Sequence, residues 1–237
     1  MFTKTFQEKK SGLLKIFLIT GIVFLSACKS DIIIKETSLA QFGVEKVLIL
    51  TFQDMSAVYG ENVNVRCPVC GNVFMTGKVA EGADHDLTEH LFFLLKDRKD
   101  IILIPASQAQ GVLSGLLSEN KIRLSEKDLF IEIGRALEAD AVIAGNIYRF
   151  RERIGTQYSV DSPASVAFDI HLIRVADGHL LWRGHFNETQ RSLSENLFRI
   201  GTFLRRKARW ITAQEMAMSG LEDVLKTFPN SDKSEPT

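Results

Sequence analysis

The distribution of hydrophobic and polar positions divides the chain into three regions. Residues 13–27 are almost uninterruptedly apolar, with Lys15 near the start of the stretch. Residues 44–228 alternate short apolar runs with polar and glycine-containing segments, which predicts a folded domain. Residues 229–237 begin with a proline and are otherwise polar, so we expect a tail after the fold.

Five segments of the middle region have the branched, apolar composition of β-strands. They are residues 44–52, 100–105, 140–150, 166–172 and 180–186. The turn sequence at 176–178 predicts a hairpin between the last two. Gly145 lies inside the third predicted strand, where a glycine indicates a bulge or a close approach of another group.

Four further segments have apolar residues at helical spacing. We expect a helix that begins at Asp84 or Asp86, with Leu87, Leu91, Leu94 and Leu95 on one side. A short helix is expected at 107–117. Ser125 and Thr212 each precede an acidic residue by three positions, so they are predicted to cap helices at 125–138 and 212–228.

The order of these elements predicts an α/β domain, with a mixed sheet of about five strands covered by helices. Residues 53–84 hold four glycines and two cysteines without periodicity, so we interpret them as a cysteine-containing insertion. Residues 28–43 are expected to be a linker that precedes the domain at 44–228.

Several blocks of this domain resemble one superfamily of bacterial envelope proteins. The blocks are residues 47–54, 87–95, 101–105, 133–147 and 174–182. The resemblance is to the group that contains the TolB amino-terminal domain, the curli-secretion lipoprotein CsgG and the penicillin-binding-protein activator LpoB. It implies the fold of that group and, through CsgG, a possible role in an outer-membrane secretion apparatus.

The amino terminus has the pattern of a secretory signal peptide, with lysines before the apolar stretch and a polar segment after it. Leu25-Ser26-Ala27-Cys28 resembles the lipobox of bacterial lipoproteins. This resemblance implies cleavage after residue 27, acyl chains on Cys28 and durable membrane anchoring. By analogy with enteric bacteria, Lys29 favours the periplasmic face of the outer membrane.

Composition excludes several classes of protein. Apolar residues make up 45% of the 237 residues and charged residues 24%, as in globular proteins. The formal net charge is zero, which gives no basic field for nucleic acid. We therefore expect no nucleic acid as partner. The lipobox-like sequence and the resemblance to envelope proteins imply membrane attachment through lipid and an envelope protein or peptidoglycan as partner.

Two cysteines in the insertion are candidate metal ligands. Cys67-Pro-Val-Cys70-Gly71 resembles a zinc knuckle, and His85 and His90 complete a four-ligand spacing. An exported protein also meets an oxidising compartment, where Cys67 and Cys70 would form a disulfide. We slightly prefer the disulfide, with structural zinc as the alternative and a redox-linked role as a further one.

A basic cluster precedes the last predicted helix. Four cations precede an indole in the cluster of Arg205, Arg206, Lys207, Arg209 and Trp210, which suits an acidic partner or lipid headgroups but also an ordinary surface.

Asp169 and His171, with Ser162, Ser165 and His185 nearby, could suggest a hydrolase. Because the sequence holds no nucleophile elbow, metalloprotease helix or phosphate-binding loop, we interpret them as a polar strand face. The sequence thus predicts a non-catalytic binding or assembly factor of the cell envelope.

Overall fold

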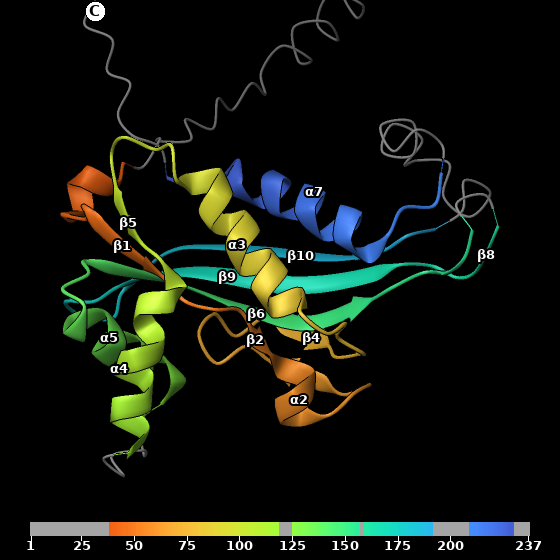
Figure 1. Ribbon diagram of the computed structural model, residues 1–237, viewed down its shortest axis with the longest axis horizontal. Coiled ribbons are helices and arrows are strands. Elements are labelled where there is room, and N and C mark those ends of the chain that lie inside the picture. The colour runs from red at the N-terminus through yellow and green to blue at the C-terminus, as the bar shows by residue number, and fades with distance from the viewer. Residues whose placement is uncertain (1–37, 119–124, 157–158, 192–208, 230–237) are drawn as a thin grey trace, which may run out of the picture. The chain divides into compact units, whose positions relative to one another are not determined.

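The computed structural model describes residues 38–118, 125–156, 159–191 and 209–229. These residues build a six-stranded sheet with helices packed against it (Figure 1). The predicted signal peptide, Cys28 and most of the linker lie outside the described residues. Within the described ranges, every helix is too short or too polar to cross a membrane.

The sheet is mixed, as predicted. In order across the sheet, its strands are β10 (Leu180–Thr189), β9 (Ser165–Arg174), β6 (Ala141–Arg151), β1 (Lys46–Ile49) and β5 (Ile102–Ile104). β1 is parallel to β5 and β6, whereas β6, β9 and β10 are antiparallel. The sixth strand, β2 (Gln53–Asp54), extends the pairing along β6.

Helices α3 (Ala83–Leu95) and α7 (Ala213–Leu225) cover one face of the sheet. Leu87, Leu91 and Leu95 are buried there, so most of the predicted apolar stripe is confirmed. The predicted cap is wrong, because α3 is preceded by Gly82 with φ 78° and both aspartates lie in its first turn. Thr212 caps α7 through a capping box, as predicted.

Helices α4 (Ala106–Ser118) and α5 (Glu126–Ala136) pack on the opposite face, against Leu48 and Val142. Neighbouring residues of one strand point to opposite faces, which is why Leu48 and Ile49 belong to different cores. The Ser125 hydroxyl accepts a hydrogen bond from Asp128 N, so the predicted cap of α5 is confirmed.

The segment predicted as an insertion contains short elements of its own. After β2 come α2 (Met55–Tyr59), β3 (Asn64–Arg66) and β4 (Val73–Met75), the last two forming an antiparallel hairpin. Val65 and Phe74 of this hairpin pack against Tyr148 and Ala167 of the sheet. Ala167 points away from the α3–α7 core that contains its neighbours on β9, so the hairpin covers the face opposite α3 and α7.

Three short elements complete the described chain. They are η1 (Leu39–Phe42) before β1 and the two-stranded pair of β7 (Ile154–Gly155) and β8 (Val160–Ser162) between β6 and β9. The hairpin predicted between the last two long strands is confirmed, with Gly178 at φ 67° in its turn.

Candidate metal centre

A tight turn after β3 brings the two cysteines of the insertion together. Cys67 N donates a hydrogen bond of 2.7 Å to Asn72 O, and Gly71 N donates one of 3.0 Å to Cys67 O. Gly71 has φ 77°, a conformation that glycine adopts without a steric penalty. The amide of Cys70 then lies 3.4 Å from Cys67 Sγ and donates to it. This geometry resembles the zinc knuckle that the sequence indicated.

Strand β9 supplies two more polar side chains beneath this turn. Asp169 and His171 are two residues apart and therefore point to the same face of the sheet. Ile170 and Leu172 point to the other face and belong to the α3–α7 core. Both polar side chains are 0% exposed, because the insertion covers this polar face of the strand.

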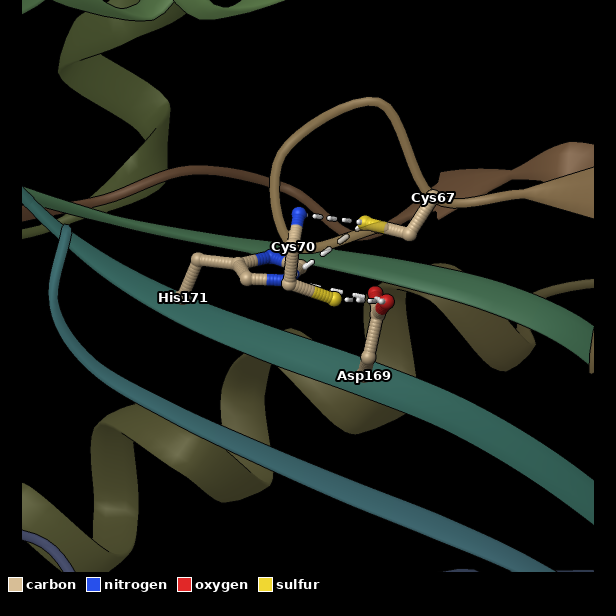
Figure 2. Close-up of side chains that lie close together, drawn as sticks. All are labelled: Cys67, Cys70, Asp169 and His171. Carbon is tan, nitrogen blue, oxygen red and sulfur yellow. Dashed lines mark hydrogen bonds and ion pairs between the residues drawn. The ribbon is translucent and has the colours of Figure 1, made fainter. Parts of the chain in front are cut away.

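Figure 2 shows how the four side chains converge. One donor atom each from Cys67, Cys70, Asp169 and His171 lies within 4.8 Å of all the others. Cys67 Sγ is 3.5 Å from His171 Nε2, and Cys70 Sγ is 3.7 Å from Asp169 Oδ2. His171 Nε2 is 3.6 Å from the same carboxylate oxygen. The cluster thus presents two sulfurs, one imidazole nitrogen and one carboxylate oxygen to a common centre.

Neighbouring strand β6 holds the carboxylate in place. Tyr148 Oη donates to Asp169 Oδ2 over 3.0 Å, and Asn146 Nδ2 donates to Asp169 Oδ1 over 3.1 Å. Both donors are buried, which fixes the direction of the carboxylate. Arg183, on β10, donates to the carbonyl oxygen of Cys70 over 3.4 Å and places a positive charge beside the cluster.

Burial controls the protonation of the cluster. It raises the pKa of the Cys67 thiol from 9.0 to about 12, and the nearby charge of Asp169 adds to this effect. It lowers the pKa of His171, against the opposing influence of Asp169. Burial, and then Asp169, raise the pKa of Tyr148, so its hydroxyl remains a donor. Without a bound cation, Cys67 is therefore a neutral thiol at pH 7 and His171 a neutral imidazole.

The ligand set predicted from sequence spacing is wrong in its two histidines. His85 and His90 lie on α3, which covers the opposite face of the sheet from Cys67 and Cys70. His90 Nε2 lies 4.0 Å from Glu222 Oε1 on α7, and His85 borders a groove between α3 and α7. The sheet itself separates these histidines from the cysteines.

The two cysteines of the predicted disulfide are both free in the structure. Their sulfur atoms belong to the same group of converging donors, so the disulfide and the metal site compete for the same two residues. The disulfide stays a prediction that a thiol count can test.

The basic cluster before α7 is only partly described. Arg205, Arg206 and Lys207 lie outside the described residues. Arg209 forms an ion pair with Glu215 of α7, and its carbonyl accepts a hydrogen bond from Gln190 Nε2. Trp210 is half-buried. Arg209 therefore has a partner within the domain, and binding of an external partner by this cluster stays a prediction.

The remaining residues considered for a hydrolase have other contacts. Ser165 Oγ accepts a hydrogen bond from Arg149 Nε over 2.6 Å, and the His185 ring lies against Phe74 with centroids 6.3 Å apart. Ser162 lies on β8, which pairs with β7 in a separate two-stranded sheet. The sequence signal that could have identified Asp169 and His171 is their position between apolar residues that alternate without interruption.

Comparison with known proteins gives only distant likenesses. No protein-family model and no curated protein matches the sequence. Among solved structures, PelC from Paraburkholderia phytofirmans, described as a dodecamer, is 15% identical, with 80% of this chain and 90% of that chain covered and a TM-score of 0.41. The LpoB C-terminal domain from Escherichia coli is 16% identical, with 62% of this chain and 83% of that chain covered and a TM-score of 0.37.

Lipoprotein GNA1162 from Neisseria meningitidis is 12% identical, with 69% of this chain and 98% of that chain covered and a TM-score of 0.38. LpoB is also one of the proteins in the group that the sequence resembles, and the membership of this chain in that group stays a prediction. At these identities and TM-scores, the matches carry no inference about what this chain binds.

Proposed function

We propose that this protein is a lipid-anchored, non-catalytic binding or assembly factor of the bacterial cell envelope. The observation that carries the proposal is the sequence Leu25-Ser26-Ala27-Cys28 at the end of the apolar stretch. Two or three acyl chains on Cys28 would hold the domain at a membrane, because each buried methylene contributes about 0.8 kcal/mol.

In this role, the folded domain would carry the binding surface for the partner, held at the membrane by the lipid on Cys28. In the sequence, residues 29–37 separate Cys28 from Ser38, the cap of η1, and we propose that they serve as a short tether. An anchored domain meets its partner at a high local concentration, so a modest binding surface suffices. We propose an envelope protein or peptidoglycan as that partner, with membership of an outer-membrane secretion apparatus as the alternative.

Lipid attachment can be tested on the full-length protein in its bacterial host. Growth with an alkyne-labelled fatty acid should label the wild type and leave Cys28→Ala unlabelled. Cys70→Ala is the matched control, because it removes a cysteine of the domain and should retain the label. An unlabelled wild type, or a Cys28→Ala variant that keeps the label, would refute the proposal.

Sorting to the outer membrane is tested separately with Lys29→Asp. In an enteric host, density-gradient separation should place the wild type in outer-membrane fractions and shift the variant toward the inner membrane. If both proteins stay in the inner membrane, the outer-membrane assignment is wrong, although the lipid anchor would stand.

A further inference from the structure

Three separations among the four converging side chains match those of a tetrahedral metal site, and all four ligand atoms lie within 4.8 Å of one another. A zinc ion with sulfur ligands at about 2.3 Å and nitrogen or oxygen ligands at about 2.0–2.1 Å holds these atoms about 3.3–3.8 Å apart. The observed separations are 3.5 Å between Cys67 Sγ and His171 Nε2, 3.7 Å between Cys70 Sγ and Asp169 Oδ2, and 3.6 Å between the nitrogen and that oxygen. All three therefore match the edges of a zinc tetrahedron.

The nitrogen-to-oxygen separation is also informative by itself. A hydrogen bond between His171 and Asp169 would bring the two atoms to about 2.7–3.2 Å. At 3.6 Å they are too far apart for that bond, although both side chains are fully buried. The space between them is what a shared metal ion needs.

We propose that Cys67, Cys70, Asp169 and His171 bind one zinc ion that fastens the β3–β4 hairpin to strand β9. Two sulfurs and an imidazole favour zinc over magnesium or calcium, which prefer six or more oxygen ligands. With four protein ligands, the tetrahedron is complete and the site is structural rather than catalytic. The proposal does not depend on the lipid anchor.

Neighbouring groups form hydrogen bonds to two of the proposed ligands, Cys67 and Asp169, and fix their orientation. Tyr148 and Asn146 hold both oxygens of Asp169, and the Cys70 amide donates to the sulfur of Cys67. Hydrogen bonds of this kind orient metal ligands and tune their affinity. Binding would deprotonate both thiols, release two protons to solvent and leave a net charge of −1 on the site, beside the guanidinium of Arg183.

The β3–β4 hairpin shares only a small apolar core with the sheet, so a metal ion would add to its attachment. Beyond the cysteines, the hairpin contacts the sheet through a small cluster in which Val65 and Phe74 pack on Tyr148 and Ala167. Phe74 also contacts the His185 ring, and Arg149 donates a hydrogen bond to Met75 O. A bound metal would link the loop of the hairpin to the middle of β9 and so supply what the small core lacks. A disulfide would use the two sulfurs alone and leave the buried carboxylate and imidazole without this role.

The test is the metal content of the full-length protein, purified in detergent without chelators and measured by inductively coupled plasma mass spectrometry. We expect about one zinc ion per chain for the wild type, and a fall of at least about tenfold in Cys70→Ser and in Asp169→Asn. His85→Ala and His90→Ala are the matched controls and should retain the zinc. Circular dichroism checks that each variant is folded.

Two results would overturn the proposal. Zinc that is lost in the His85 and His90 variants but retained in Asp169→Asn would restore the ligand set of the sequence spacing. A wild type without zinc would also refute it, and a thiol count under denaturing conditions would then distinguish a disulfide, with no free thiol at Cys67 and Cys70, from two free thiols.

A second measurement avoids the risk that the variants fail to fold. Wild-type protein stripped of metal and refilled with Co²⁺ should show thiolate-to-cobalt charge-transfer bands and the intense visible bands of a tetrahedral site. Hydrogen exchange should be faster at residues 62–77 after stripping, while β6 and β9 stay protected. Absence of the charge-transfer bands, or exchange at 62–77 that does not respond to metal, would contradict the proposal.

Discussion

The hydroxyl group of Tyr148 donates a hydrogen bond of 3.0 Å to Oδ2 of Asp169, and both side chains are fully buried. Tyr148 lies at a bulge of β6, where the register with β9 shifts between Ile147 and Arg149. Ile147 and Phe150, three residues apart, consequently both face the α3–α7 core, while Tyr148 faces the cysteines. The bulge thus aims a phenol at the carboxylate of the proposed zinc site.

This contact predicts the effect of Tyr148→Phe. The phenylalanine ring can keep the stacking on Phe74, where the centroids are 4.2 Å apart, but it removes the hydroxyl donor. We expect zinc affinity to fall by about 10–100-fold, because the carboxylate loses an orienting partner. A competition titration with a chromophoric chelator measures this change. Tyr59→Phe, on the exposed end of α2, is the control and should not alter affinity. Equal affinities of Tyr148→Phe and wild type would contradict the prediction.

Gly145 marks a close approach, as the sequence indicated. A Cβ atom at this position would lie 2.3 Å from Cε1 of the Phe52 ring, which is itself packed edge-on against Phe168. We expect Gly145→Ala to lower the free energy of unfolding by about 1–3 kcal/mol in urea denaturation. Gly111→Ala, on an open position of α4, should instead raise it by about 0.5–1 kcal/mol. The same sign for both variants would argue against a steric cause.

Thr88 links α3 to the sheet. Its hydroxyl accepts a hydrogen bond of 3.0 Å from the buried Phe52 N and donates one of 2.6 Å to Asp84 O. Valine has nearly the same shape but no acceptor, so Thr88→Val should cost about 1–3 kcal/mol by leaving Phe52 N unpaired. Thr88→Ser keeps the hydroxyl and should cost only about 0.8 kcal/mol for the lost methyl group. Thermal unfolding should show Thr88→Val to be less stable than Thr88→Ser. If packing of the methyl group dominates, Thr88→Ser should be the less stable of the two.

The ion pair at the start of α7 predicts a pH dependence. Hydrogen bonds from Arg209 hold the pKa of Glu215 below its ordinary value of 4.5. A lowered carboxyl pKa stabilises the fold above the ordinary value, and this stabilisation is lost as the pH falls through the lowered one. We expect Glu215→Gln to be less stable than wild type at pH 7, by at most about 1 kcal/mol because the pair is partly exposed.

This difference in stability should shrink as the pH falls from 4.5 through the lowered pKa of Glu215, where the carboxylate of the folded wild type becomes protonated. Chemical denaturation at several pH values measures it. Glu61→Gln, in an exposed loop, serves as the control for removing one carboxylate from the surface. A difference between wild type and Glu215→Gln that grows on acidification would show that the ion pair is not its source.

Local features of the fold were largely predictable. The capping box at Thr212, the cap at Ser125 and the hairpin turn at Gly178 depend on residues within a few positions of each other, and each was confirmed. The start of α3 was not, because aspartates are strong caps in sequence whereas the backbone here turns at Gly82. Asp84 and Asp86 lie in the first turn of α3 instead, where their negative charges interact favourably with the positive end of the helix dipole.

Half of the candidate zinc site was predictable and half was not. Cys67 and Cys70 are neighbours in sequence, and their short spacing already indicated two converging sulfurs. His171 contacts Cys67 across 104 positions of sequence, and no local pattern reports such a contact. His85 is closer to the cysteines in sequence, so the local spacing indicates it instead of His171.

The sequence by itself determined which residues are apolar on one side of an element, where α5 and α7 are capped, and that a lipobox-like sequence precedes the domain. These properties follow from the side chains and their spacing alone. Only the tertiary structure decided which face of the sheet each element covers. Because strand order and the fold of the insertion place the β3–β4 hairpin over Asp169 and His171, and α3 on the other face, the cysteines meet these two residues and not His85 and His90.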